Sequence, residues 1–155
     1  MQPSKLLSKI TGQLDKVSFQ SSSDFHWDPV DKTIWYVEDV LDSRHGQLLL
    51  IHEVGHALLG HQEFNSDIDL LKKEVLAWVE ARQIAQTCQI GFDEELVEQC
   101  LNTYRQWIDK RSTCPECQQT GYQSSGTYHC FNCNHRWRVS NSQTTRVCRL
   151  SAMPR

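Results

Sequence analysis

Residues 48–61 read LLLIHEVGHALLGH and contain three histidines and one glutamate within an otherwise apolar segment. His52 and His56 are four residues apart, so on a helix both side chains lie on one face and can bind the same metal ion. Glu53 lies to one side of this pair, where it can act as general base toward a water molecule on that metal. Because such polar groups are costly in a core without partners, the segment predicts a zinc site with Glu53 as its catalytic residue.

A third ligand is needed, because catalytic zinc usually takes three protein ligands and a water molecule. His61 follows His56 by five residues, and on a continuous helix it points away from the two ligands. Glu74 stands out among the acidic residues downstream, because it lies on the next predicted helix beside apolar residues that face inward. We predict Glu74 as the third ligand and keep His61 and Glu80 as alternatives.

A second metal motif lies in the C-terminal part of the chain. Four of the seven cysteines form two C-x-x-C pairs, Cys114 with Cys117 and Cys130 with Cys133. Each pair makes a tight turn that presents two thiolates, and four thiolates complete a tetrahedral zinc shell. The pattern resembles the zinc ribbons of many nucleic-acid and transcription proteins. Two zinc ions per chain are therefore expected, one catalytic and one structural.

The segments around these motifs predict a mixed α+β fold. Apolar spacing predicts helices over residues 4–17, 47–60, 67–88 and 94–111, and residues 24–39 read as a β-hairpin. In the third helix, the predicted inward stripe consists of Ile68, Leu71, Val75 and Val79. We divide the chain into a zincin-like metallopeptidase domain (1–110), a β zinc ribbon (111–140) and a tail (141–155) that could add a ribbon strand.

Charge is distributed unevenly along the chain. Residues 1–109 hold 9 Lys and Arg against 18 Asp and Glu, a net charge of −9, whereas residues 110–155 hold 7 against 1, a net charge of +6. The basic side chains predicted to form a phosphate-binding face on the ribbon are Arg136, Arg138, Arg146 and Arg149. The alternative is that the ribbon caps the preceding helix or docks onto the acidic N-terminal part.

HEVGHALLGH, followed after a short loop by Glu74-Val-Leu-Ala77-Trp78, resembles the ImmA/IrrE-type bacterial metallopeptidases, which are gluzincin-like zinc enzymes. The resemblance covers roughly residues 20–87. It implies His52, His56 and Glu74 as zinc ligands, Glu53 as base and hydrolysis of peptide bonds, in some members within a DNA-bound repressor. Trp78 departs from the pattern, because that family usually has Asn or Asp there. A looser similarity links the chain to SprT-like DNA-associated proteases, whose third ligand is a histidine well downstream.

We therefore expect a zinc-dependent metalloendopeptidase that cleaves a protein or peptide, with the substrate extended along an edge strand near residues 34–38. The alternatives are a non-catalytic zinc-binding adaptor, whose ribbon binds nucleic acid or a partner protein, and a SprT-like protease. The chain lacks an apolar run of membrane-spanning length and a signal-peptide pattern. The sequence thus predicts a cytoplasmic protein without a membrane partner.

Overall fold

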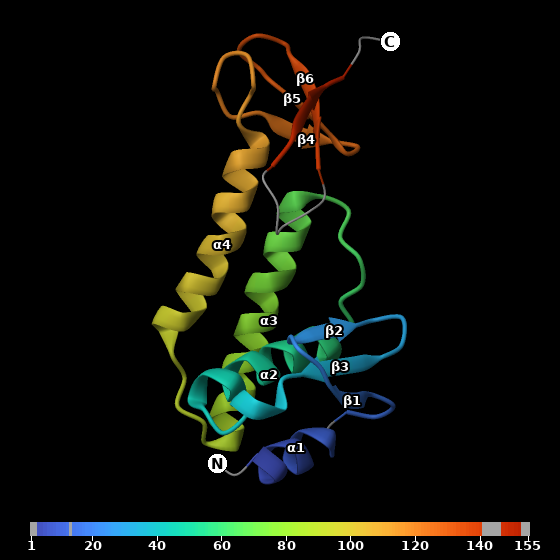
Figure 1. Ribbon diagram of the computed structural model, residues 1–155, viewed down its shortest axis with the longest axis vertical. Coiled ribbons are helices and arrows are strands. Elements are labelled where there is room, and N and C mark those ends of the chain that lie inside the picture. Colours follow the sequence, from blue (N-terminus) through green and yellow to red (C-terminus); the bar gives the residue numbers. More distant parts are fainter. Residues whose placement is uncertain (1–2, 13, 141–146, 153–155) are drawn as a thin grey trace. The chain divides into compact units, whose positions relative to one another are not determined.

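The computed structural model describes residues 3–12, 14–140 and 147–152 (Figure 1). It is a mixed α+β structure with small sheets, as predicted. The chain forms two compact units, one of residues 1–63 and 72–98 and the other of residues 64–71 and 99–155. Among the described residues, every helix is too short or too polar to cross a membrane.

The first unit combines helices with a three-stranded sheet. Strand β3 pairs with β2 in antiparallel fashion, which gives the predicted hairpin, and with β1 in parallel. Its elements, in chain order, are α1 (Pro3–Thr11), β1 (Ser18–Ser21), β2 (His26–Asp28), β3 (Thr33–Tyr36), a short 3-10 helix η1 (Glu38–Val40), α2 (Arg44–Leu58) and most of α3 (Asp67–Cys88). The first helix ends at Thr11, well short of the predicted residue 17, and is followed by Gly12.

The position of β3 corrects the prediction of an edge strand near residues 34–38. In the sheet order β1-β3-β2, strand β3 is the central strand and has no free edge. The sequence of β1, SFQS, lacks an apolar alternation that would reveal it as a strand. A peptide that extends this sheet must therefore pair with β1 or β2, and β2 is the edge strand that contacts α2.

Helix α2 has defined signals at both ends. At its start, the Ser43 side chain accepts a hydrogen bond from the Gly46 amide, a typical N-cap. At its end, Gly60 adopts a positive φ of 61°, and the His61 amide donates to the His56 carbonyl over 3.0 Å. This turn ends the helix with a residue in the left-handed conformation, as glycine allows.

The buried face of α3 differs from the predicted stripe. Val75 and Val79 are 38% and 50% exposed, and Ile68 is 51% exposed. The buried side chains of α3 within the first unit are instead Glu74, Ala77, Trp78, Ala81, Ile84, Ala85 and Cys88. The sequence analysis placed large aliphatic residues on the buried face. In the structure this face includes three alanines, Ala77, Ala81 and Ala85, and their small side chains permit a close approach to α2.

The second unit contains a four-stranded antiparallel sheet with the order β4-β5-β6-β7. Its core comprises Cys114, Tyr128, Cys130 and Trp137, of which Trp137 is fully buried. The elements are most of α4 (Glu94–Ser112), β4 (Tyr122–Ser124), β5 (Thr127–His129), β6 (Arg136–Val139) and β7 (Arg149–Ser151), the last drawn from the tail of the chain.

A buried ion pair explains why this unit extends beyond the cysteine segment. The Arg111 guanidinium donates to both carboxylate oxygens of Asp67, over 2.6 and 3.2 Å, and both residues are only 2% exposed. Tyr128 donates its hydroxyl proton to the same carboxylate over 2.5 Å, and Trp107 lies against the guanidinium. The domain boundary that the sequence analysis places after residue 110 separates Asp67 from Arg111 and Tyr128, which this network joins.

Candidate metal centres

Two histidines of α2 and one glutamate of α3 converge within the first unit. The Nε2 atoms of His52 and His56 lie 3.2 Å apart, and each faces the Glu74 carboxylate, at 3.1 and 3.5 Å respectively. The three side chains are nearly enclosed, with exposures of 8%, 12% and 8%. The structure thus places Glu74, rather than His61 or Glu80, against the Nε2 atoms of the two histidines.

These donor atoms have the spacing that a zinc ion requires. Zinc–nitrogen and zinc–oxygen bonds of about 2.0–2.1 Å in a tetrahedron place neighbouring donors about 3.3 Å apart. The three separations, 3.1, 3.2 and 3.5 Å, lie close to this value. Among the described residues, His52, His56 and Glu74 form a cluster that no fourth His, Cys, Asp or Glu joins, so one tetrahedral position is left for another ligand.

Electrostatics favour the ionised state of Glu74 that metal binding needs. Burial acts to raise the pKa of this carboxyl group, but the hydrogen bonds and the positive charges of His52 and His56 together outweigh burial and lower the pKa to about 2. Glu53 behaves differently, because burial raises its pKa, and the two histidines and a hydrogen bond from the Trp27 backbone only partly counter the effect. A carboxylate with a raised pKa next to the cluster is a better proton acceptor than an ordinary one.

A glycine allows the two helices to approach closely enough for these contacts. A Cβ atom built on Gly55 would lie 2.5 Å from the Ala77 carbonyl oxygen, a distance that real Cβ atoms do not adopt. Gly55 precedes His56, and Ala77 lies about one turn after Glu74 on α3. The glycine of the HEVGH motif and the alanine of the following helix therefore set the distance between the ligands.

Substituting Gly55 with alanine is expected to push α2 and α3 apart. We expect a loss of about 1–3 kcal/mol of unfolding free energy, typical of an overpacked core, together with weaker zinc binding at this cluster. Thermal unfolding and metal analysis measure both effects. Gly12→Ala is the matched control, because its new Cβ would meet nothing closer than 3.7 Å; equal behaviour of the two variants would contradict the role of Gly55.

His61 contacts the site from behind the ligands. Its Nδ1 lies 2.9 Å from the Nδ1 of His56, and its carbonyl oxygen accepts a hydrogen bond from the Trp27 indole over 2.9 Å. If His56 held a metal through Nε2, its proton would lie on Nδ1 and would be donated to His61, which would fix the tautomer and the ring orientation. The turn at Gly60, which helical phase alone does not include, brings His61 back to this position.

Replacing His61 with alanine is expected to weaken zinc binding at this cluster about 10- to 100-fold, the usual effect of removing a partner behind a metal ligand. Zinc titration against a chelating dye measures the change, with no need for a substrate. His45→Ala is a suitable control, because His45 is an exposed histidine in the first turn of the same helix. Total loss of zinc would instead indicate that His61 is itself a ligand.

Trp78 is the residue at which the sequence departs from the expected motif, which usually has Asn or Asp there. Its indole stacks on the His52 ring with the centroids 4.2 Å apart and the planes 23° apart. Among the described residues, the buried Nδ1 of His52 has no hydrogen-bond partner. The tryptophan thus holds His52 through ring contact rather than through the hydrogen bond that an Asn or Asp side chain would offer.

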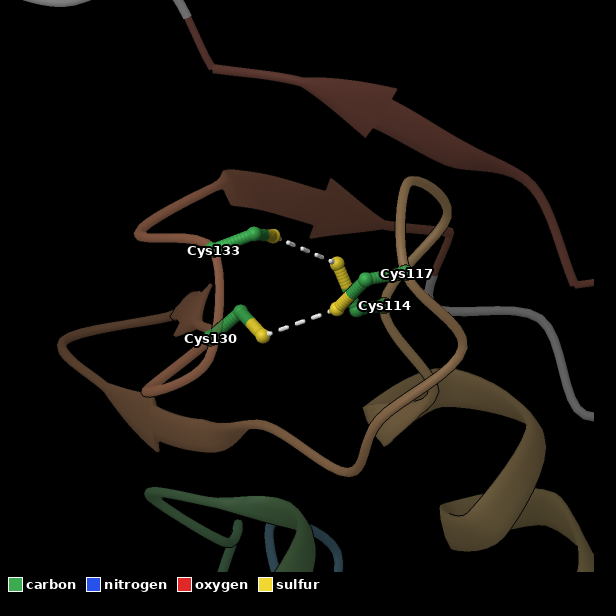
Figure 2. Close-up of side chains that lie close together, drawn as sticks. All are labelled: Cys114, Cys117, Cys130 and Cys133. Atoms are coloured by element: carbon green, nitrogen blue, oxygen red, sulfur yellow. Dashed lines mark hydrogen bonds between the residues drawn. The ribbon is translucent and has the colours of Figure 1, made fainter.

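The second metal cluster lies within the second unit, where two loops present the four cysteines to one another (Figure 2). The Sγ atoms of Cys114 and Cys133 are 3.6 Å apart, and those of Cys117 and Cys130 are 3.4 Å apart. A zinc–sulfur bond of about 2.3 Å predicts separations of about 3.8 Å. The cluster therefore fits a zinc ribbon, and both candidate sites are compatible with zinc.

The pKa values of two of the cysteine thiols also favour a bound cation. A hydrogen bond from the Asn132 side chain is the main cause that lowers the pKa of Cys117 to about 6. For Cys133, a backbone hydrogen bond from His135 favours the thiolate, but burial and the three neighbouring sulfurs outweigh it and raise the pKa to about 12. A thiolate raises the pKa of a neighbouring thiol, whereas a bound divalent cation lowers it and lets the neighbouring cysteines ionise together.

Two of the four arginines predicted to form a phosphate-binding face lie together on one face of the sheet. Arg136 and Arg138 are exposed and lie on one face of β6. Arg149 pairs across from Val139 on the opposite face, and its guanidinium donates to the Thr113 carbonyl oxygen over 2.7 Å. Arg146 lies outside the described residues.

Comparisons with protein-family models, with curated protein sequences and with solved structures give no match to this chain.

Proposed function

We propose that the chain is a zinc-dependent metalloendopeptidase, in which His52, His56 and Glu74 hold the catalytic metal and Glu53 is the general base. The observation that carries the proposal is the cluster of three donors, 3.1–3.5 Å apart, beside a separate half-buried glutamate, Glu53. Structural zinc sites are closed by four protein ligands, whereas catalytic sites use three and keep one position open. The described residues supply three, which favours catalysis over a purely structural role.

Zinc bound at this site would supply a Lewis acid that polarises the substrate carbonyl and lowers the pKa of a water molecule. The chain itself handles the protons. Glu53 accepts the proton of the attacking water, and the resulting carboxylic acid then donates it to the leaving amine. His61 holds His56 in the tautomer that presents Nε2 to the cluster, and Trp78 holds the His52 ring.

The edge strand β2 is the proposed position for the substrate. Within the described residues, β3 is the one strand that pairs with β2, and the Trp27 backbone hydrogen-bonds to Glu53. An extended peptide that adds to this edge would receive main-chain hydrogen bonds close to the general base. The substrate class is therefore a protein segment in extended conformation, rather than a folded helix.

The proposal is tested by comparing the wild-type chain with Glu53→Gln on a library of peptides from a digested proteome, with the products identified by mass spectrometry. Zinc-dependent cleavages that appear with the wild type and disappear with the variant support the proposal. Cleavage that is unchanged in the variant overturns it.

A further inference from the structure

One face of the β4–β7 sheet is open to solvent. Directly opposed residues of neighbouring strands lie on the same face of a sheet, and Tyr122, His129 and Arg136 are opposed across β4, β5 and β6. A second row on this face runs through Ser124, Thr127, Arg138 and Leu150. The opposite face holds the buried Tyr128 and Trp137, so it belongs to the core. We call the side chains of the two rows the open ribbon face.

The open ribbon face is hollowed and basic. A hollow of about 680 Å³ is lined by side chains that include Ser124, Thr127, His129, Arg136 and Arg138, and none of the described residues that line it is acidic. Within the part of the chain that the structure describes, neither arginine of this face forms an ion pair with a carboxylate. The hollow therefore offers two uncompensated guanidinium groups and several hydroxyl groups to an anion.

Stacked aromatic rings adjoin these charges. Tyr122 stacks on Phe131 with the centroids 4.4 Å apart and on His129 with the centroids 5.2 Å apart, and both pairs are within 22° of parallel. Phe131 is 78% exposed, so its outer ring surface faces solvent. His129, the last ring of this row, lies directly opposite Arg136 in the pairing of β5 with β6.

We propose that the open ribbon face, together with the adjoining Phe131 ring, binds single-stranded nucleic acid, with a base stacked on Phe131 and the phosphates contacted by Arg136 and Arg138. Binding sites for single strands combine a basic groove with aromatic rings on which bases stack. The two arginines are two residues apart on one strand, so their Cα atoms are about 6.6 Å apart, and they can contact neighbouring phosphates of one strand. A duplex keeps its bases stacked on each other and cannot use the exposed ring.

The test uses the full-length zinc-loaded chain and a labelled oligothymidylate of about 12 nucleotides, within the usual site size of such proteins. Fluorescence anisotropy is measured over a range of salt concentrations. Phe131→Ala leaves the charge unchanged and is expected to weaken binding about 5- to 150-fold, the effect of losing one stacked base. The double variant Arg136→Gln/Arg138→Gln is expected to reduce the slope of log affinity against log salt by about 1.4, because two phosphate contacts are lost.

Controls separate specific binding from general attraction. Lys110→Gln removes one exposed positive charge of the same unit, outside the open ribbon face, and is expected to change affinity little. Metal analysis checks that each variant keeps its ribbon zinc. An oligouridylate of equal length shows whether RNA binds in the same way, and its binding with the same dependence on Phe131 also supports the proposal.

Three results would overturn the proposal: no binding of either oligonucleotide, equal affinity for a duplex or for polyglutamate, or an undiminished affinity of the Phe131 variant. Binding is expected to persist in Glu53→Gln, because the open ribbon face does not depend on the proposed peptidase site. The two proposals can therefore fail separately.

Discussion

Replacing Glu53 with glutamine is expected to abolish peptide cleavage while the chain keeps both zinc ions. Glutamine has nearly the same shape as glutamate but cannot accept a proton from water, so the rate should fall about 10²- to 10⁴-fold, the usual contribution of a general base. Glu53 is not one of the three clustered donors, which is why zinc should remain. The measurement is the rate of cleavage of a peptide selected from the library, together with zinc content per chain.

The control for this variant is Glu63→Gln, which removes an exposed carboxylate of the same unit. It should cleave at the wild-type rate. If Glu53→Gln lost zinc as well as activity, Glu53 would be a ligand rather than a base. If it kept full activity, the hydrolytic mechanism would be wrong.

Replacing Glu74 with glutamine should empty the first metal site and leave the second one occupied. The neutral amide is a much weaker ligand than the carboxylate, whose lowered pKa keeps it ionised. Since loss of a partner behind a ligand already weakens binding 10- to 100-fold, loss of the ligand itself should weaken it by more than about 100-fold. Metal analysis after dialysis against a weak chelator should give one zinc per chain instead of two.

Glu80→Gln is the matched control, because Glu80 lies on the same helix outside the cluster. It should retain two zinc ions. Two ions in the Glu74 variant and one in the Glu80 variant would reverse the assignment.

The sequence predicts which side chains cluster at the first candidate site, because periodicity determines which side chains share a helix face. Four-residue spacing places His52 and His56 together, and their Nε2 atoms lie 3.2 Å apart. Position on the following helix selected Glu74, which the structure places at this pair. The role of His61 could not be predicted in the same way, because it depends on the turn at Gly60 and on which nitrogen of His56 faces away from the cluster.

Other features depend on long-range packing and leave little trace in local sequence. The polar strand β1 makes β3 central, and no alternation in SFQS reveals it. The inward face of α3 was wrongly assigned to its large aliphatic residues, because helix contact through Gly55 and Ala77 favours small ones. Asp67 and Arg111 form a buried ion pair although they are 44 residues apart in the sequence. A count of charged residues does not show which of them are paired and buried.

The most direct test of the proposed zinc site is anomalous diffraction at the zinc edge from crystals of the zinc-loaded chain. We predict one peak at the four cysteines and a second about 2.0–2.2 Å from His52 Nε2, His56 Nε2 and a Glu74 oxygen, with a water molecule as fourth ligand. A second peak whose shell is completed by His61 in place of Glu74, a fourth protein ligand that closes the site, or no second peak would contradict it.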